Sequence, residues 1–215
     1  MIKVIPQYVP KEPFTVCVSG GIDSICAAHW LKHHYHKKFG MVHFNHWVQP
    51  TINNNMEVNV AKFAKDFNIG CLYSCRSNPD FSDTSENGLR EWRLSEMKFW
   101  GGKFITAHHL DDACENYLSN CFTGNPEHKP ISEFTQFDKF SIYHPFLLTT
   151  KQDFIDYANE NDLMKYVVED PTNKDTKYKR NWIRNVIVPE LNERDMGLQT
   201  IVRKKFYNNL IKTEL

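Results

Sequence analysis

Six residues near the start of the chain have the types and spacing of a loop that could hold a phosphate. They are Ser19-Gly20-Gly21-Ile22-Asp23-Ser24, between an apolar run at 14–18 and a segment with helical spacing at 25–31. A strand, a turn of small residues and a helix in this order aim free backbone N–H groups and the positive end of a helix dipole at an anion. The Asp23 carboxylate would repel a bound anion unless a Mg²⁺ ion bridges the two. The plainer alternative is a Gly-Gly turn with a serine cap.

A second group of reactive side chains lies in the segment 106–122. Apolar residues recur there at the spacing of one buried helix face, namely Leu110, Ala113, Cys114, Tyr117, Leu118, Cys121 and Phe122. At about 100° per residue, Asp112 and Glu115 point away from that face, and His108 joins them if the first turn reaches it. Such a carboxylate pair could hold Mg²⁺ or a cationic substrate. Acids in a first turn also simply complement the helix dipole.

The elements that must position these groups alternate along the chain up to about residue 160. We expect strands at 14–18, 40–44, 69–74, 103–107 and 141–143, and helices near 24–35, 54–67, 85–100 and 109–122. This alternation predicts an α/β fold, a Rossmann-like parallel sheet with helices on both faces. Ligands bind at the carboxyl ends of such strands, so the loop 19–24, Asn45-His46 and His108-His109 become candidates.

The last third of the chain is predicted to be helical and basic. The stretch 123–139 resembles a surface loop, and Thr150 with Asp153 forms a capping-box pattern that begins a further helix. Helical segments follow near 176–194 and 197–212. From residue 177 onward there are nine Lys/Arg and four acids, a net charge of +5 that suits a polyanion, although a basic helix face also keeps proteins soluble. We therefore expect a catalytic domain at 1–160 and a small basic helical extension at 161–215, packed on it.

The six cysteines and the absence of long apolar runs narrow the class of protein. The cysteines are Cys17, Cys26, Cys71, Cys75, Cys114 and Cys121. None forms a CxxC pair, which leaves little support for a zinc or iron–sulfur site. No run reaches the length of a membrane span, and the first residues lack the apolar core of a secretory signal. We expect a cytoplasmic protein with no membrane partner.

Ordered motifs along most of the chain resemble those of the tRNA(Ile)-lysidine synthetases, in the N-type ATP pyrophosphatase (PP-loop) superfamily. They are SGGIDS at 19–24, HFNH at 43–46, LREWR at 89–93, TAHHLDDACEN at 106–116, HPFLLTTKQDFIDYA at 144–158 and EDPTNKDTKYKRNWIRNVIVPEL at 169–191. The first motif marks only the superfamily, whereas the last is the specific one.

This resemblance implies a reaction in two steps. ATP adenylates carbon 2 of the wobble cytidine of a CAU-anticodon tRNA(Ile), and the ε-amine of free lysine then displaces AMP to give lysidine. The resemblance implies an ATP site of Ser19, Gly20, Gly21, Ile22, Asp23, Ser24, His43 and His108, with Asp23 on Mg²⁺. Asp112 and Glu115 would bind and deprotonate the lysine amine, and Arg90 would complete the catalytic set. The expected tRNA contacts are Lys179, Arg180, Arg184, Arg203, Lys204 and Lys205.

Each assignment has a plainer alternative. Arg93 could be a structural ion-pair partner, and His43 and His46 could be merely hydrogen-bonded. Arg180 and Arg184 could dock their helix onto Asp170 or another acid instead of binding tRNA. Trp182 and Ile183 are expected in the core.

The sequence also departs from the family pattern. Trp47-Val48-Gln49 and His144 stand where the family commonly has arginines, and Asn116 replaces a threonine. Cellular members usually carry further tRNA-binding domains, which makes this chain resemble a short form. Either the basic tail replaces them, or affinity is weak, or a homodimer shares the substrate. Two rival functions are a tRNA thiolase of the same superfamily and a non-catalytic RNA-binding module.

Overall fold

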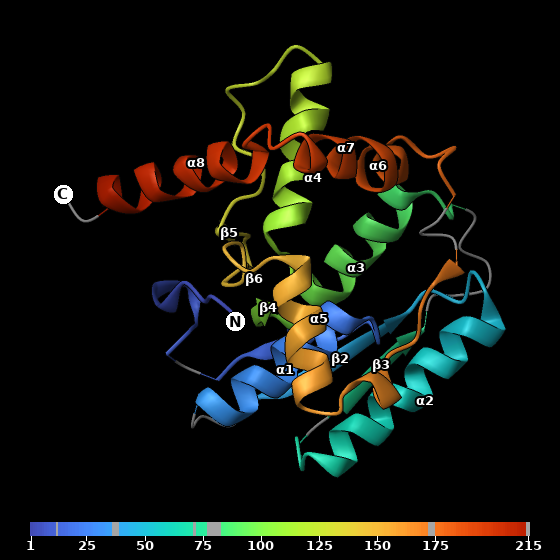
Figure 1. The fold of residues 1–215 in the computed structure, drawn as a ribbon. Coiled ribbons are helices and arrows are strands. Elements are labelled where there is room, and N and C mark those ends of the chain that lie inside the picture. The colour runs from blue at the N-terminus through green and yellow to red at the C-terminus, as the bar shows by residue number, and fades with distance from the viewer. Residues whose placement is uncertain (12, 36–38, 71, 77–82, 172–174, 214–215) are drawn as a thin grey trace.

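The chain folds around a six-stranded, mostly parallel sheet (Figure 1). The computed structural model describes residues 1–11, 13–35, 39–70, 72–76, 83–171 and 175–213. The strand order is β3-β2-β1-β4-β6-β5, and only the β5–β6 pair is antiparallel. The strands are β1 Thr15–Cys17, β2 Gly40–Asn45, β3 Leu72–Arg76, β4 Gly102–Ile105, β5 Phe134–Gln136 and β6 Phe140–Tyr143. The predicted α/β, Rossmann-like class is confirmed.

The helices follow the strands as the alternation predicted. They are α1 Ile22–His34, α2 Pro50–Asp66, α3 Glu86–Trp100, α4 Leu110–Phe122, α5 Lys151–Glu160, α6 Lys179–Trp182, the π-helical η4 Ile183–Ile187, α7 Val188–Glu193 and α8 Leu198–Thr213. The capping box of Thr150 and Asp153 is present at the start of α5. Helix α2 begins four residues earlier than predicted because Pro50 suits the first helical turn.

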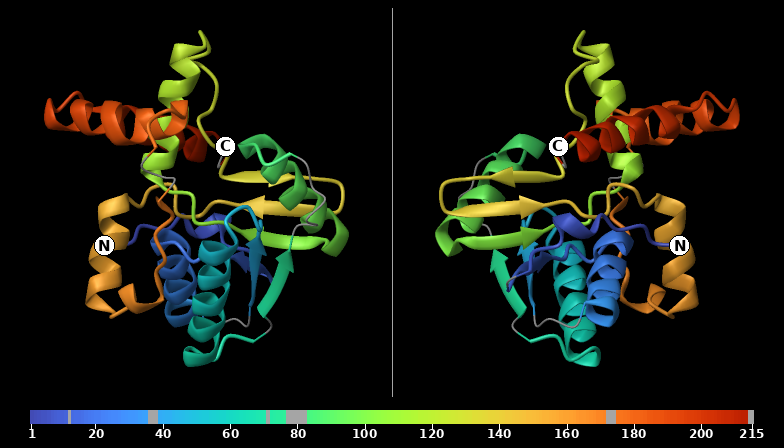
Figure 2. Two further views of the ribbon diagram at one scale, coloured as in Figure 1. Left: turned by 90° about the vertical axis from the view of Figure 1, so that its right-hand side faces the viewer. Right: turned by 90° about the vertical axis from the view of Figure 1, so that its left-hand side faces the viewer.

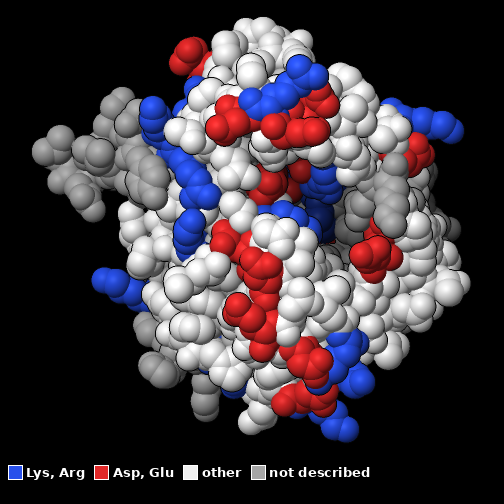
Figure 3. Space-filling view, in the orientation of Figure 1, with Lys and Arg blue, Asp and Glu red and all other residues white. Residues whose placement is uncertain are grey.

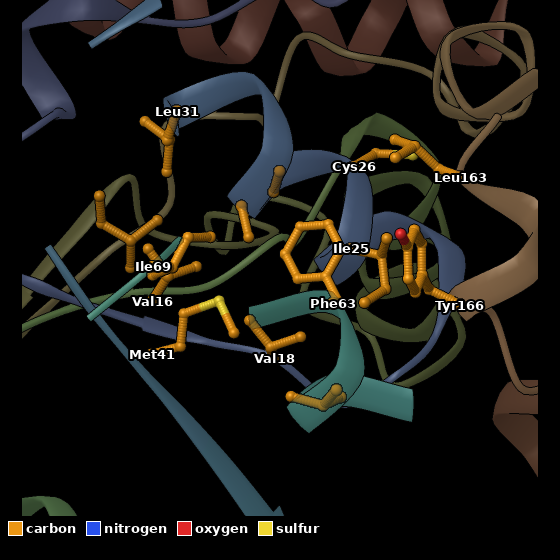
Figure 4. Packing of buried hydrophobic residues seen from close by; sticks show 14 of the residues in the cluster. Val16, Val18, Ile25, Cys26, Leu31, Met41, Phe63, Ile69, Leu163 and Tyr166 are labelled. Atoms are coloured by element: carbon orange, nitrogen blue, oxygen red, sulfur yellow. The ribbon is translucent and has the colours of Figure 1, made fainter. Parts of the chain in front are cut away.

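Helices cover both faces of the sheet (Figure 2). Strand β2 shows the alternation that this requires, since Met41 packs in the cluster with α1, α2 and α5, whereas Val42 packs with α3. Figure 4 shows Val16 and Met41 of the sheet close to Ile25 of α1 and Phe63 of α2, all fully buried. This core fixes the start of α1, and with it the loop that precedes α1.

A third hydrophobic cluster joins α4 to the C-terminal helices. Helix α4 projects away from the sheet, with α8 on one side and α6 and α7 on the other (Figure 1). Leu110 and Ala113 of α4 pack in one cluster with Ile183, Val202 and Phe206. Among the described residues, none of the helices has both the length and the apolarity needed to span a bilayer.

Two predictions about elements need correction. The stretch 123–139, expected as a loop, contains β5, whose residues are at most half-buried and pair with β6 through Phe134 opposite Tyr143. A three-residue edge strand has too few buried positions to leave a period-two pattern. The helix predicted at 176–194 begins at Lys179 and widens into the π-helical segment η4. Pro189, the second residue after η4, has no N–H for the carbonyl of Asn185, so the regular ladder is interrupted here.

Candidate active site

Hydrogen bonds between serine hydroxyl groups and the backbone stabilise the loop from Ser19 to Ser24. The Gly21 amide donates to Ser19 Oγ (3.2 Å), and Ser24 Oγ donates to the Gly21 carbonyl (2.9 Å). Gly20 has φ +92°, and a Cβ there would lie 3.2 Å from Met56 Cβ, so this position favours glycine. Gly21 is the N-cap of α1 and makes no side-chain cap bond. The first-turn N–H groups of α1 therefore suit an anion, as the loop sequence predicted.

Asp23 lies in the first turn of α1 between two cationic partners. Lys151 Nζ is 2.7 and 2.9 Å from its two carboxylate oxygens, and His109 Nε2 is 3.6 Å away. Burial acts to raise the pKa of Asp23, but His109 and Lys151 outweigh it and hold the pKa below its ordinary value. Asp23 is thus an anionic, hard oxygen donor beside the phosphate loop.

Lys151 was missed by the sequence analysis, although a signal was present. It is the first residue of α5, where a cation is unfavourable next to the positive end of the helix dipole. Its backbone N–H also donates to Asp111 Oδ2 at 2.7 Å. A lysine at such a position suggests a carboxylate partner elsewhere, and here that partner is Asp23.

His109 links the loop to the acidic helix and was also missed as a central residue. It is buried and is the N-cap of α4, where Nδ1 lies 3.2 Å from the Asp111 amide nitrogen and 3.5 Å from Asp111 Oδ2, and its own amide donates to Asp112 Oδ2 (3.0 Å). Its Nε2 lies 3.4 Å from Asp112 Oδ2 and 3.6 Å from Asp23 Oδ2. Burial would lower its pKa, but the surrounding carboxylates raise the pKa to about 10. A proton on Nε2 therefore lies between Asp23 and Asp112.

Asp112 and Glu115 are buried, which corrects the expectation that they lie on a side of α4 facing away from the core. Only 8% and 3% of their surfaces are exposed. Two arginines from α6 and η4 cover them: Arg184 Nε is 2.6 Å from Glu115 Oε1, and Arg180 Nη2 is 3.2 Å from Asp112 Oδ1. The angular analysis gave the direction of the two acids but could not show that another helix packs there.

Arg180 and Arg184 contact several carboxylates at once. Arg184 Nη2 also reaches both Asp112 Oδ1 (3.1 Å) and Glu115 Oε2 (2.9 Å), and Arg180 Nη1 is 2.8 Å from Glu86 of α3. The docking alternative therefore describes this structure, with Asp112 and Glu115 among the acids that the two arginines contact. Burial favours the neutral carboxyl of Asp112, but His109, His108 and the arginines hold its pKa well below the usual range.

The predicted histidines lie at the carboxyl ends of β2 and β4. His43 is 2% exposed and donates from Nδ1 to the Val18 carbonyl (2.8 Å), which leaves Nε2 as an acceptor without a hydrogen-bond partner among the described residues. His108 Nδ1 is 2.8 Å from Thr106 Oγ1, which also contacts His144 Nδ1 at 2.5 Å. Burial lowers the pKa of His108 to about 4. His144, whose pKa burial also lowers, thus forms a neutral pair with His108.

The remaining predicted cations are divided between the site and the surface. Arg90 lies exposed on α3, and its charge contributes to the lowered pKa of His144. Arg203 of α8 donates to the Leu148 carbonyl (3.0 Å), Lys205 donates to the Pro126 carbonyl (3.0 Å), and Lys204 is exposed. Lys179 is exposed on α6, across α4 from α8 (Figure 1). The expected tRNA contacts therefore form two groups, one on each side of α4.

Positive and negative side chains meet at the centre of this face of the molecule. Figure 3 shows Lys/Arg and Asp/Glu side by side where the surface is hollowed between α4, α5 and α6. Among the described residues, no three His, Cys, Asp or Glu side chains form a ready metal site. A Mg²⁺ ion held by one carboxylate and by phosphate oxygens does not need one, so Asp23 and the loop fit that ion.

Comparison with known proteins identifies relatives over most of the chain. A tRNA(Ile)-lysidine synthase from Exiguobacterium sibiricum is 30% identical over 197 residues, which cover 89% of this chain and 46% of that protein. The corresponding synthase of Staphylococcus epidermidis (strain ATCC 35984) is 30% identical over 199 residues, covering 85% of this chain and 45% of that protein. The chain thus spans about half the length of the curated relatives it matches.

Solved structures with low sequence identity share the fold. The U34-tRNA thiolase NcsA of Methanococcus maripaludis superposes with a TM-score of 0.73 at 14% identity, covering 92% of this chain and 71% of that one. The NH3-dependent NAD synthetase of Campylobacter jejuni gives a TM-score of 0.51 at 12% identity, covering 94% and 87% of the two chains. The model of the PP-loop domain matches residues 2–191. The chain belongs to the PP-loop family.

Proposed function

We propose that this protein is a tRNA(Ile)-lysidine synthase. In the proposed reaction, ATP adenylates the O2 position of the wobble cytidine and releases pyrophosphate. The lysine ε-amine then forms a bond to carbon 2 while the bond to AMP breaks. The observation that supports this most is the connection from Asp23 through His109 Nε2 to Asp112, which joins a phosphate loop to an acidic pair within a few ångströms.

The phosphate end of the site would bind ATP. The loop Ser19–Ser24 offers backbone N–H groups, and His43 Nε2 offers an unused acceptor to the nucleotide. Asp23 would hold Mg²⁺, which would neutralise charge on the departing pyrophosphate. Lys151 Nζ, which forms an ion pair with Asp23 in this structure, would then be available to bind a phosphate oxygen.

The acidic end would receive the lysine amine. A protonated amine is not a nucleophile, so the side chain must lose a proton to a nearby base before or during attack. Asp112 and Glu115 would accept it, since both are buried carboxylates and Asp112 lies beside His109. Arg180 and Arg184 contact both acids in the absence of substrate. Arg90, on α3, would stabilise charge that develops on the activated base.

Incubation with ATP, Mg²⁺, lysine and a CAU-anticodon tRNA(Ile) transcript tests the proposal directly. Mass spectrometry of the digested tRNA should show lysidine, with one AMP and one pyrophosphate released per modified base. A parallel reaction with a sulfur donor instead of lysine tests the thiolase alternative. Sulfur uptake without lysine uptake, or pyrophosphate release that does not depend on tRNA, would overturn the proposal.

Three of the described cysteines give little support to the thiolase alternative. Burial raises the pKa of Cys17, Cys26 and Cys114 to about 12, so these thiols are protonated at neutral pH. Cys71 lies outside the described residues. The likeness to a tRNA thiolase at 14% identity reflects the shared fold.

A further inference from the structure

A row of large apolar side chains faces solvent on the helix that supplies Arg180 and Arg184. Tyr178, Trp182 and Val186 follow one another at four-residue spacing and are 64%, 40% and 44% exposed. Phe122, at the end of α4, is 53% exposed, and its ring centre lies 6.3 Å from that of Trp182. We call the three aromatic residues Tyr178, Trp182 and Phe122 the aromatic row. The expectation that Trp182 lies in the core was wrong.

The helix is therefore two-sided. Arg180 and Arg184 point to the buried acids, and Ile183, at 1% exposure, anchors the helix in the cluster with α4 and α8. Trp182 is rotated by about 200° from Arg180, which places it on the opposite side. The Trp182 side chain is therefore not needed to hold the helix in place. A large aromatic ring that is exposed without such a role suggests a binding function.

The charge around the row indicates the kind of partner. Residues 176–189 contain no acid, and the two lysines among them, Lys177 and Lys179, stand on either side of Tyr178 in the sequence. Lys177 and Lys179 are exposed and alternate with Tyr178 along the chain. Aromatic rings interleaved with cations bind unpaired nucleic-acid bases by stacking while the cations contact the phosphates.

We propose that the aromatic row stacks unpaired bases of an RNA loop whose neighbouring base enters the active site. This inference rests on the proposed function for the nature of the RNA. A base that is to react at carbon 2 must leave its stack, and the bases beside it lose a stacking partner. The rings of the aromatic row would replace that stacking partner. They lie on the outer side of the helix, and the inner side of the same helix contacts the buried acids. Trp182 is the central residue of the row.

The test measures binding of a CAU anticodon stem-loop RNA at several salt concentrations. Trp182→Ala should weaken binding by about 5- to 100-fold at each salt concentration, with an unchanged slope of log K against log salt, because stacking releases no counterions. Trp182→Phe should keep most of the affinity. Lys179→Gln should instead make the slope of log K against log salt less steep by about 0.7 to 0.9, because one phosphate contact is lost.

Phe99→Ala is the matched control. Phe99 is 84% exposed on α3, about 20 Å along that helix from Glu86, so its loss should leave RNA binding unchanged. Sedimentation of the same variants tests whether the row instead joins two copies of the chain. Wild-type RNA affinity in Trp182→Ala, or a loss of affinity that follows loss of a dimer, would overturn the inference. If the RNA binds as expected but lysidine is not formed, the proposed function fails and the stacking surface stands.

Discussion

At the scale of single residues, His109 is the group that couples the two ends of the site. It caps α4, contacts Asp112 and Asp23, and has its pKa raised to about 10 by these acids after burial has acted in the other direction. The sequence named His109 only as one of several residues that follow a strand. Its role depends on Asp23, 86 positions away, and helical periodicity within 106–122 contains no information about that distance.

The position of Lys151 in the sequence already indicated that it has a tertiary contact. The capping box of Thr150 and Asp153 was identified from sequence, and the lysine between them occupies the wrong end of a helix for its charge. That conflict between local preference and residue type marks a functional or tertiary contact. The loop 19–24, in contrast, was predictable because its own serines and glycines make most of its turn, with Ser19 and Ser24 bonded to each other and to Gly21.

His29 gives a prediction about pH and stability. Burial, with His33 and His34, lowers its pKa to about 4, and its Nδ1 is 2.8 Å from the Tyr157 hydroxyl. The unfolded chain binds this proton near pH 6.5, whereas the folded chain binds it only near pH 4. Stability should therefore fall as pH decreases from about 6.5 to 4, by up to about 1.4 kcal/mol per pH unit for this one group.

Urea unfolding at pH 7.5, 6 and 5 measures this effect. His29→Gln should flatten the pH dependence relative to the wild type, whereas substitution of the exposed His128 by Gln should not. His46 and His108, whose pKa values are also lowered to about 4, would keep part of the slope in the His29 variant. An identical slope in wild type and His29→Gln would show that this histidine is not held neutral.

At the scale of elements, α8 is expected to supply phosphate contacts. Lys204 is exposed on this helix, and Arg203 and Lys205 donate to the carbonyls of Leu148 and Pro126. Lys204→Gln should weaken tRNA binding and reduce the salt slope by about 0.7 to 0.9, because one phosphate contact is lost. Lys98→Gln, an exposed lysine on α3, is the control. A salt slope equal to that of the wild type would remove Lys204 from the tRNA surface.

The elements that were predicted well are those with strong local patterns. Strand β2 and helices α1 and α4 showed clear apolar spacing and appear within a few residues of their expected bounds. Strand β5 was missed because pairing with β6, rather than its own sequence, holds it in place. The burial of Asp112 and Glu115 depends on the docking of α6 and η4, which no pattern within α4 reveals.

At the scale of the whole molecule, the C-terminal helices share a core with the sheet domain. Val202 and Phe206 of α8 are fully buried in the cluster that contains Leu110 and Leu147. The division at residue 160 remains a prediction, and the family model itself runs through residue 191. Phe206→Ala should lower the free energy of unfolding by about 3 to 5 kcal/mol in a single transition. Two separate transitions in calorimetry would show that α8 belongs to an independent unit.

The central claim is that one rim binds the activating nucleotide and receives the amine. The most direct test is transfer of label from ATP labelled at the α-phosphate to tRNA in the presence of lysine. Glu115→Gln should adenylate the tRNA and retain the label because lysine cannot complete the reaction, and Asp23→Asn should give at least about 100-fold less adenylation. Asp156→Asn, on the exposed side of α5, should behave as the wild type. Lysidine formation at the wild-type rate by Glu115→Gln, or normal labelling by Asp23→Asn, would contradict the account.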